Sequence, residues 1–232
     1  MAATAVSADS TPIDPTTVAT ISGTVKFDGA APTPKKIDMR QDPACTGDNE
    51  GESLVVAGGQ LANVFVYVKD GLGNRTFKPP ATAAIIDQRG CRYHPHVLGA
   101  MTGQTIQIRD DDPTTHNIHP MPRHNREWNV SQTASSPLVE RSFPNEEIMM
   151  PMKCNLHPWM RMYINIVKSP FFAVTDQSGK YEIQGLPPGD YTIAFVQEKL
   201  GEHDEKVTLG PKESRTLDAT FKAQSGQTSF SW

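Results

Sequence analysis

The sequence predicts an all-β protein made of two packed sheets or of two small β-sandwiches. Short alternating or apolar runs recur between Gly, Pro, Asn and Asp residues along most of the chain. No window sustains the apolar periodicity of a long helix. The 232 residues suffice for one large β domain or for two domains of about 100 residues each, either of which can bury a core.

Regular structure is predicted to begin near Thr20. Residues 1–18 are rich in Ala, Thr, Ser, Pro and Asp without apolar periodicity, which predicts a disordered leader, and 223–232 are expected to form a tail. The predicted strands, in chain order, are 21–27, 63–69, 83–87, 105–109, 163–168, 181–184, 191–197, 206–209 and 215–221.

The C-terminal third has the clearest pattern of turns and strands. Residues 175–179 read Thr-Asp-Gln-Ser-Gly, which predicts a turn before the strand that begins at Lys180. Residues 185–189 read Gly-Leu-Pro-Pro-Gly, which predicts a tight reversal before the returning strand 190–195.

This pattern resembles the carboxypeptidase regulatory-like (transthyretin-like) β-sandwich, whose opening strand is similar to residues 21–27. The resemblance implies a discontinuous sandwich over 19–82 and 169–222, with a second β domain inserted at 83–168. Domain insertions are tolerated at exposed loops whose ends lie close together.

Residues 152–161 carry a cluster of soft metal-binding side chains and read Met-Lys-Cys-Asn-Leu-His-Pro-Trp-Met-Arg. The thiol of Cys154, the imidazole of His157 and the thioether of Met160 are of the types that select copper. A structural zinc site is the main competitor, but it prefers four strong ligands and rarely uses a thioether. The cluster therefore favours copper.

A second imidazole must come from elsewhere, and His116 is the best candidate because it follows the strand 105–109 and an acidic turn. The two segments together resemble the cupredoxins, most closely the amicyanin and plastocyanin group. The resemblance implies a cupredoxin Greek-key β-sandwich with one type 1 copper ion, held by His116, Cys154 and His157 in the equatorial plane and by Met160 on the axis. It also implies that Asn117 ties the two ligand loops together and supports the thiolate.

Two features depart from the cupredoxin pattern. Met162 has the longer spacing from His157 that other cupredoxins use. The choice of Met160 as the axial ligand therefore rests on the sequence Pro-Trp-Met at 158–160. The loop 121–145 is unusually long, and it could cover the site or dock a partner.

The expected electron port is the exposed edge of His157, beside Pro158 and Trp159, where a donor or acceptor redox protein would dock. Ordinary packing of Trp159 against a neighbouring strand is an equal alternative. His94, His96, His119 and His124 could form a second metal site, but satisfied surface histidines are the commoner case, and His96 could instead point inward near the copper.

Cys45 and Cys91 stand in polar, turn-like surroundings and could pair in a disulfide. Such a bond predicts an oxidising compartment, such as a bacterial periplasm. The alternative is that both are small buried hydrophobic residues.

Composition narrows the partners and the compartment. The formal net charge is -4, with Lys and Arg spread along the chain, so no nucleic-acid partner is expected. No apolar stretch is long enough for a membrane span, and the first residues lack the features of a signal peptide. A periplasmic or otherwise exported protein whose signal has been removed would look the same.

Three function classes follow from these observations. An electron carrier, not an enzyme, is favoured by the complete type 1 ligand set. A multicopper enzyme needs many more histidines than the seven present. A copper-binding structural, interaction or storage module stays open as the alternative, whereas no arrangement typical of a hydrolase or a nucleotide-binding loop is found.

Overall fold

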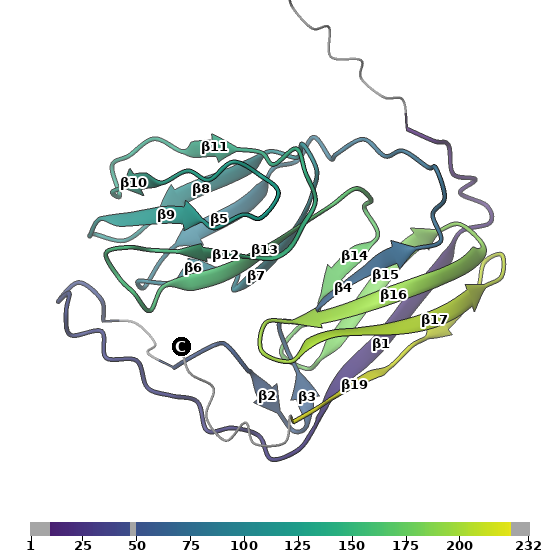
Figure 1. The fold of residues 1–232 in the computed structure, drawn as a ribbon, viewed down its shortest axis with the longest axis horizontal. Coiled ribbons are helices and arrows are strands. Elements are labelled where there is room, and N and C mark those ends of the chain that lie inside the picture. Colours follow the sequence, from purple (N-terminus) through teal and green to yellow (C-terminus); the bar gives the residue numbers. More distant parts are fainter. Residues whose placement is uncertain (1–9, 47–49, 224–232) are drawn as a thin grey trace, which may run out of the picture.

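The computed structural model describes residues 10–46 and 50–223, which form strands and turns without a helix (Figure 1). The strands belong to four sheets. The predicted all-β class is therefore confirmed. Within the described ranges there is no helix that could cross a membrane. Residues 1–9 of the predicted leader and 224–232 of the predicted tail lie outside these ranges.

The first sandwich brings together strands from the two ends of the chain. One sheet has the order β15-β1-β3-β2, with β18 and β19 also paired to β1. Its strands are β1 (Ala19–Asp28), β2 (Val56–Ala57), β3 (Gln60–Leu61), β15 (Lys180–Leu186), β18 (Ser214–Thr216) and β19 (Ala219–Lys222). The other sheet has the order β14-β4-β16-β17. Its strands are β4 (Phe65–Asp70), β14 (Phe172–Val174), β16 (Gly189–Gln197) and β17 (Gly201–Leu209).

Alternation of side chains gives this sandwich its core. In β15, Tyr181, Ile183 and Leu186 are buried while the residues between them face outward or are half-buried. The predicted turn before β15 is present, because the Asp176 carboxylate accepts backbone N–H bonds from Ser178 (2.8 Å) and Lys180 (3.0 Å). Gly179 closes this turn at φ 71°, in the left-handed region that favours glycine.

The second sandwich contains the strands between β4 and β14. Its larger sheet has the order β10-β9-β12-β13-β7, and the facing sheet has the order β11-β8-β5-β6. The strands of the larger sheet are β7 (Val97–Met101), β9 (His116–Pro120), β10 (Val130–Gln132), β12 (Glu147–Lys153) and β13 (Arg161–Val167). Those of the facing sheet are β5 (Ala84–Gln88), β6 (Tyr93–His94), β8 (Ile106–Asp110) and β11 (Val139–Arg141).

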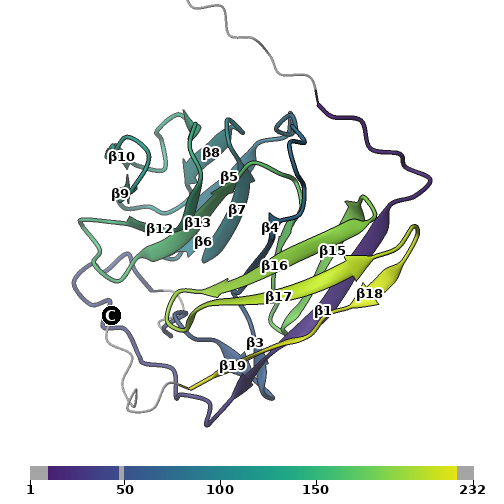
Figure 2. The ribbon, with the colours of Figure 1, turned by 45° about the vertical axis from the view of Figure 1, so that its right-hand side comes forward.

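A small apolar seam joins the two sandwiches, which lie side by side (Figure 2). Phe65 of β4, in the first sandwich, is buried together with Val97 of β7 and Val167 of β13, in the second. A β-carbon on Gly99 would lie 2.6 Å from the Phe172 ring and 2.8 Å from the Phe65 ring. Only a residue without a side chain fits there, because the seam is already closely packed.

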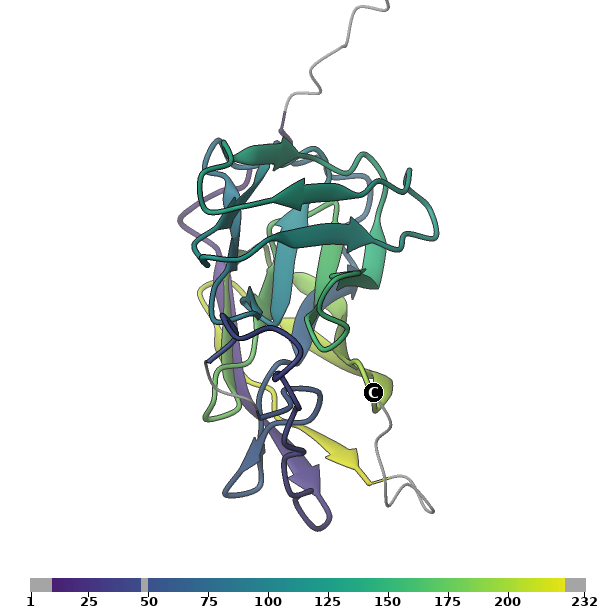
Figure 3. The ribbon, with the colours of Figure 1, turned by 90° about the vertical axis from the view of Figure 1, so that its left-hand side faces the viewer.

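The segment between β1 and β2 does not stay with the first sandwich. Met39 and Cys45 are buried in the core of the second sandwich, next to the predicted ligand segment. Figures 1 and 3 show this dark blue segment reaching the lower edge of the second sandwich. The predicted assignment of the whole range 19–82 to the first sandwich is thus wrong for this segment, and the other boundaries stay predictions.

Three further details differ from the predictions. The end of the predicted leader is held in place, since Thr11 N–H donates to the Thr76 carbonyl at 2.8 Å. The predicted strand 215–221 is two strands, β18 and β19, because between them the Thr24 N–H of β1 donates to the Asp218 carboxylate at 2.8 Å and not to a backbone carbonyl. The loop 121–145 forms edge strands, with β10 paired to β9 and β11 paired to β8.

Candidate metal centre

Two neighbouring strands bring the separate ligand segments together. β9 begins at His116 and pairs antiparallel with β12, which ends one residue before Cys154. In that register His119 lies opposite Lys153. The start of β9 therefore lies beside the loop that follows β12, although their residues are far apart in the sequence.

Hydrogen bonds fold the loop from Cys154 to Met160 back on itself. Cys154 N–H donates to the Met160 carbonyl at 3.1 Å, and Met160 N–H donates to the His157 carbonyl at 2.9 Å. The backbone N–H of His157 donates to the Cys154 sulfur at 3.4 Å. This turn directs the thiol and the imidazole to the same side.

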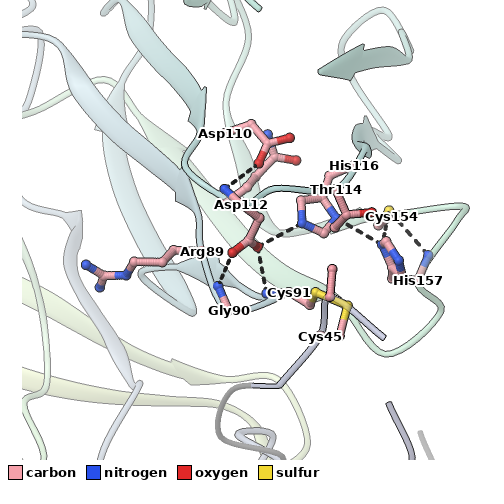
Figure 4. Close-up of polar contacts among 12 residues, drawn as sticks. Cys45, Arg89, Gly90, Cys91, Asp110, Asp112, Thr114, His116, Cys154 and His157 are labelled. Carbon is pink, nitrogen blue, oxygen red and sulfur yellow. Dashed lines mark hydrogen bonds and ion pairs between the residues drawn. A yellow bond between two sulfur atoms is a disulfide. The ribbon is translucent and has the colours of Figure 1, made fainter. Parts of the chain in front are cut away.

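The three predicted strong ligands converge in a buried cluster (Figure 4). The Nδ1 atoms of His116 and His157 lie 2.9 Å apart, and the Cys154 sulfur lies 3.8 Å from His157 Nδ1. One ligand atom from each residue lies within 4.8 Å of the other two. All three residues are at most 4% exposed, so water has little access to the space between them.

The outer nitrogens of both imidazoles bind carboxylates. His116 Nε2 lies 2.8 Å from an Asp112 oxygen, and His157 Nε2 lies 3.0 Å from an Asp42 oxygen. An ionised carboxylate only accepts hydrogen bonds, so each Nε2 donates. In the metal-free protein a protonated ring can donate its Nδ1–H to the other ring, whereas with both rings neutral the two Nδ1 lone pairs face each other. A cation between the neutral rings would satisfy both lone pairs.

Asn117 links the two ligand segments. Its backbone N–H lies 3.5 Å from the Cys154 sulfur, and its side-chain oxygen accepts the N–H of Asn155 at 2.8 Å. The thiol also lies 3.4 Å from that oxygen. Asn117 therefore contacts both ligand segments, and the role that the resemblance implies for it stays a prediction.

The same neighbours change the acidity of the thiol. Burial by itself raises the pKa of Cys154, but the His116 ring and the backbone N–H groups of Asn117 and His157 outweigh it and lower the pKa to about 7. Hydrogen bonds from Thr114, Ala44 and His157 lower the pKa of Asp42 to about 2. Asp42 is therefore ionised at neutral pH, and a much larger fraction of Cys154 is thiolate than in an ordinary cysteine.

Met160 and Met162 are both buried in the core of the second sandwich. Met160 belongs to the ligand loop, whereas Met162 lies on β13 opposite Met152 of β12. The choice of Met160 as the axial ligand stays a prediction.

Trp159 lies against the site, with its ring centroid 5.1 Å from that of His157. Its indole N–H donates to the Cys91 carbonyl at 3.2 Å. His96 turns elsewhere, because its Nε2 lies 2.8 Å from the buried Glu198 carboxylate of the first sandwich and its ring packs on Tyr163.

The predicted exposed edge of His157 is wrong. The residue is 4% exposed, and its outer nitrogen is covered by Asp42 from the segment that precedes β2. That segment is anchored nearby by a disulfide between Cys45 and Cys91, with sulfurs 1.95 Å apart. The predicted pairing of Cys45 with Cys91 is thus confirmed, and the alternative of two unpaired buried cysteines is wrong.

The other predicted histidines are engaged away from the cluster. His94 contacts the Arg89 carbonyl, His119 contacts Glu127, and His124 contacts the Glu146 carbonyl. Within the described residues, none of them joins a group of three or more possible metal ligands.

Sequence reasoning missed both carboxylates. Asp112 could have been found, because it precedes His116 by four residues in the acidic turn after the predicted strand 105–109. Asp42 gave no such signal, since 115 residues separate it from His157.

No protein-family model and no curated protein sequence matches this chain. Three solved structures illustrate the folds to which it is similar. A Cu-containing nitrite reductase from Thermus scotoductus SA-01 has 15% identity over 42% of this chain and 25% of its own length, with a TM-score of 0.35. A purple cupredoxin from Nitrosopumilus maritimus has 21% identity over 36% of this chain and 98% of its own, with a TM-score of 0.31. A mutant of amicyanin in the Cu(I) form has 17% identity over 36% of this chain and 81% of its own, with a TM-score of 0.31. The function proposed for this chain rests on its own residues.

Proposed function

We propose that this chain binds one copper ion in a type 1 site and carries single electrons. The observation that supports this most directly is the pair of imidazole Nδ1 atoms 2.9 Å apart, whose outer nitrogens both donate to carboxylates. When both rings are neutral, as metal ligation requires, their Nδ1 lone pairs repel each other, and a metal ion would satisfy both of them together with the adjacent thiolate. A thiolate with two imidazoles selects copper, with Met160 as the weak axial ligand.

The residues of the chain have three tasks in this proposal. Asp112 and Asp42 orient the rings of His116 and His157 with their lone pairs inward. Asn117 donates to the Cys154 sulfur and favours the thiolate. Bound copper would supply a reversible one-electron couple between Cu(I) and Cu(II).

An electron carrier fits the described residues better than a multicopper enzyme. The chain has seven histidines, and two belong to the cluster. The other five contact carboxylates or backbone carbonyls, namely His94, His96, His119, His124 and His203. Few imidazoles are left for further copper ions.

We further propose a periplasmic or otherwise exported location. The disulfide between Cys45 and Cys91 persists in oxidising compartments and is rare in the cytosol. A soluble redox protein would then be the natural donor or acceptor.

A copper-binding storage or structural module is the second candidate. The covered edge of His157 favours it, because such a module needs no contact between the site and a redox partner.

Loading the metal-free protein with Cu(II) distinguishes the candidates. A carrier is expected to bind one equivalent, to show the intense visible absorption and narrow EPR splitting of a copper–thiolate bond, and to be reduced reversibly by one electron. A colourless complex without an accessible potential would support the storage module. Absence of copper binding would contradict both.

A further inference from the structure

The carboxylate of Asp42 accepts three hydrogen bonds, two of them from residues of the metal-site region that are distant in the sequence. One carboxylate oxygen accepts the Ala44 N–H at 2.9 Å. The other accepts the Thr114 hydroxyl at 2.6 Å and the His157 Nε2–H at 3.0 Å. The carboxylate thus links the segment before β2, the turn before His116, and the ligand loop.

The segment that carries Asp42 is fixed on both sides of it. On the N-terminal side Met39 is buried in the second core, and on the C-terminal side Cys45 is bonded covalently to Cys91. Backbone bonds from Asp42 N–H to the Met39 carbonyl (3.2 Å) and from Cys45 N–H to the Asp42 carbonyl (3.0 Å) hold the intervening turns.

The disulfide also connects this segment to the other imidazole. Cys91 N–H donates to the Asp112 oxygen that contacts His116, at 2.7 Å (Figure 4). Both carboxylates that hold the imidazoles therefore lie beside the same disulfide.

We propose that Asp42 is a positioning residue for the metal site, which fixes the ring of His157 and closes its outer edge to solvent and partners. This inference rests on the proposed copper function. A carboxylate on the outer nitrogen makes the imidazole a stronger donor, which stabilises Cu(II) over Cu(I). With the His157 edge closed, a redox partner must dock elsewhere on the second sandwich.

The test compares Asp42→Asn and Asp42→Ala with Asp38→Ala. Asp38 is on the same segment, is exposed and pairs with Arg40, so its loss removes the same charge without touching His157. Asp42→Asn keeps the shape and an acceptor oxygen but removes the charge, and it guards against failure of the alanine variant to fold.

The first readout uses metal-free protein. Nitrogen NMR of the imidazoles is expected to show His157 as a single tautomer protonated on Nε2 in the wild type and in Asp38→Ala, and as a mixture in Asp42→Ala. Reaction of His157 with diethyl pyrocarbonate, located by mass spectrometry, is expected to be faster in Asp42→Ala than in the other two. An unchanged tautomer and reaction rate would overturn the proposal.

The second readout uses the copper-loaded protein. Asp42→Asn is expected to weaken Cu(II) binding by about 10–100-fold. If Cu(I) binding is unaffected, the potential rises by about 59 mV for each tenfold loss. A potential equal to that of Asp38→Ala would overturn the electronic part of the inference. If the wild type binds no copper, the proposed function fails, while the metal-free readout still decides whether Asp42 positions His157.

Discussion

The two sandwiches bury different kinds of residue. Of the sixteen buried polar or charged residues among those described, thirteen lie between residues 83 and 168, in the second sandwich. In the first sandwich, Thr175 and Gln197 are buried and bind the backbone of neighbouring loops. In the second, His116 and His157 contact each other and two carboxylates beside a thiol. Burying polar groups costs free energy unless they are paired, so the buried imidazoles, carboxylate and thiol at one point mark a site and not a source of stability.

Cys154→Ser tests most directly whether the buried polar cluster of the second sandwich is a copper site. The variant is expected to lose the copper–thiolate absorption completely, because an alcohol oxygen does not replace the soft sulfur. Metal-free Cys154→Ser should keep its fold, as judged by near-ultraviolet circular dichroism. A variant that stays coloured would show that this sulfur is not a ligand.

Phe195→Ala tests whether the core of the first sandwich contributes stability without shaping the copper site. Phe195 is fully buried in the first core, so truncation is expected to cost about 3–5 kcal/mol in the free energy of unfolding. Urea denaturation measures the loss, and the copper spectrum of the remaining folded protein should be unchanged. A lost spectrum in folded protein would mean that the first core shapes the site.

Gly99→Ala addresses the seam between the sandwiches. The new methyl group would meet Phe172 and Phe65 at less than van der Waals distance, so a loss of about 1–3 kcal/mol is expected. Ala100→Gly is the control, because it changes the neighbouring residue and removes a buried methyl group without crowding the seam. If Gly99→Ala unfolds in two separate steps and the wild type in one, the seam couples the unfolding of the two halves.

The thiol gives a smaller, pH-dependent effect in metal-free protein. The pKa of Cys154 is lowered from 9.0 to about 7 in the folded state, so its contribution to stability is present above pH 9 and is lost as the pH falls through 7. Thiolate ultraviolet absorbance should appear with a midpoint near pH 7, and urea midpoints should rise between pH 7 and 9. Cys154→Ser should lack both changes.

Paired glutamine variants sharpen the assignment of the axial ligand. Met160→Gln is expected to retain copper and to lower the potential, because a harder donor stabilises Cu(II). Met162→Gln, on β13, is the matched control and should instead mainly lower stability. Voltammetry of the two variants decides the assignment, and the reverse result would make Met162 the axial ligand.

The strands that the sequence revealed are those with clear alternation or apolar runs. Tyr181, Ile183 and Leu186 alternate with outward-facing positions in β15, and this strand was predicted. Predictions missed β9 and β12, because β9 begins with His116 and Asn117 and β12 contains Pro151 and a register shift. These segments become strands because their neighbours supply hydrogen-bond partners, and that information is not local.

The sequence by itself determined the all-β class and the closeness of Cys154 and His157, because side chains a few residues apart in one loop can reach a common point. It also allowed the pairing of Cys45 with Cys91. Only the tertiary structure brought His116 to the thiol and placed Asp42 over His157. Such contacts depend on strand register and on the path of a covering segment, which are set by packing across the whole chain and not by local residue preference.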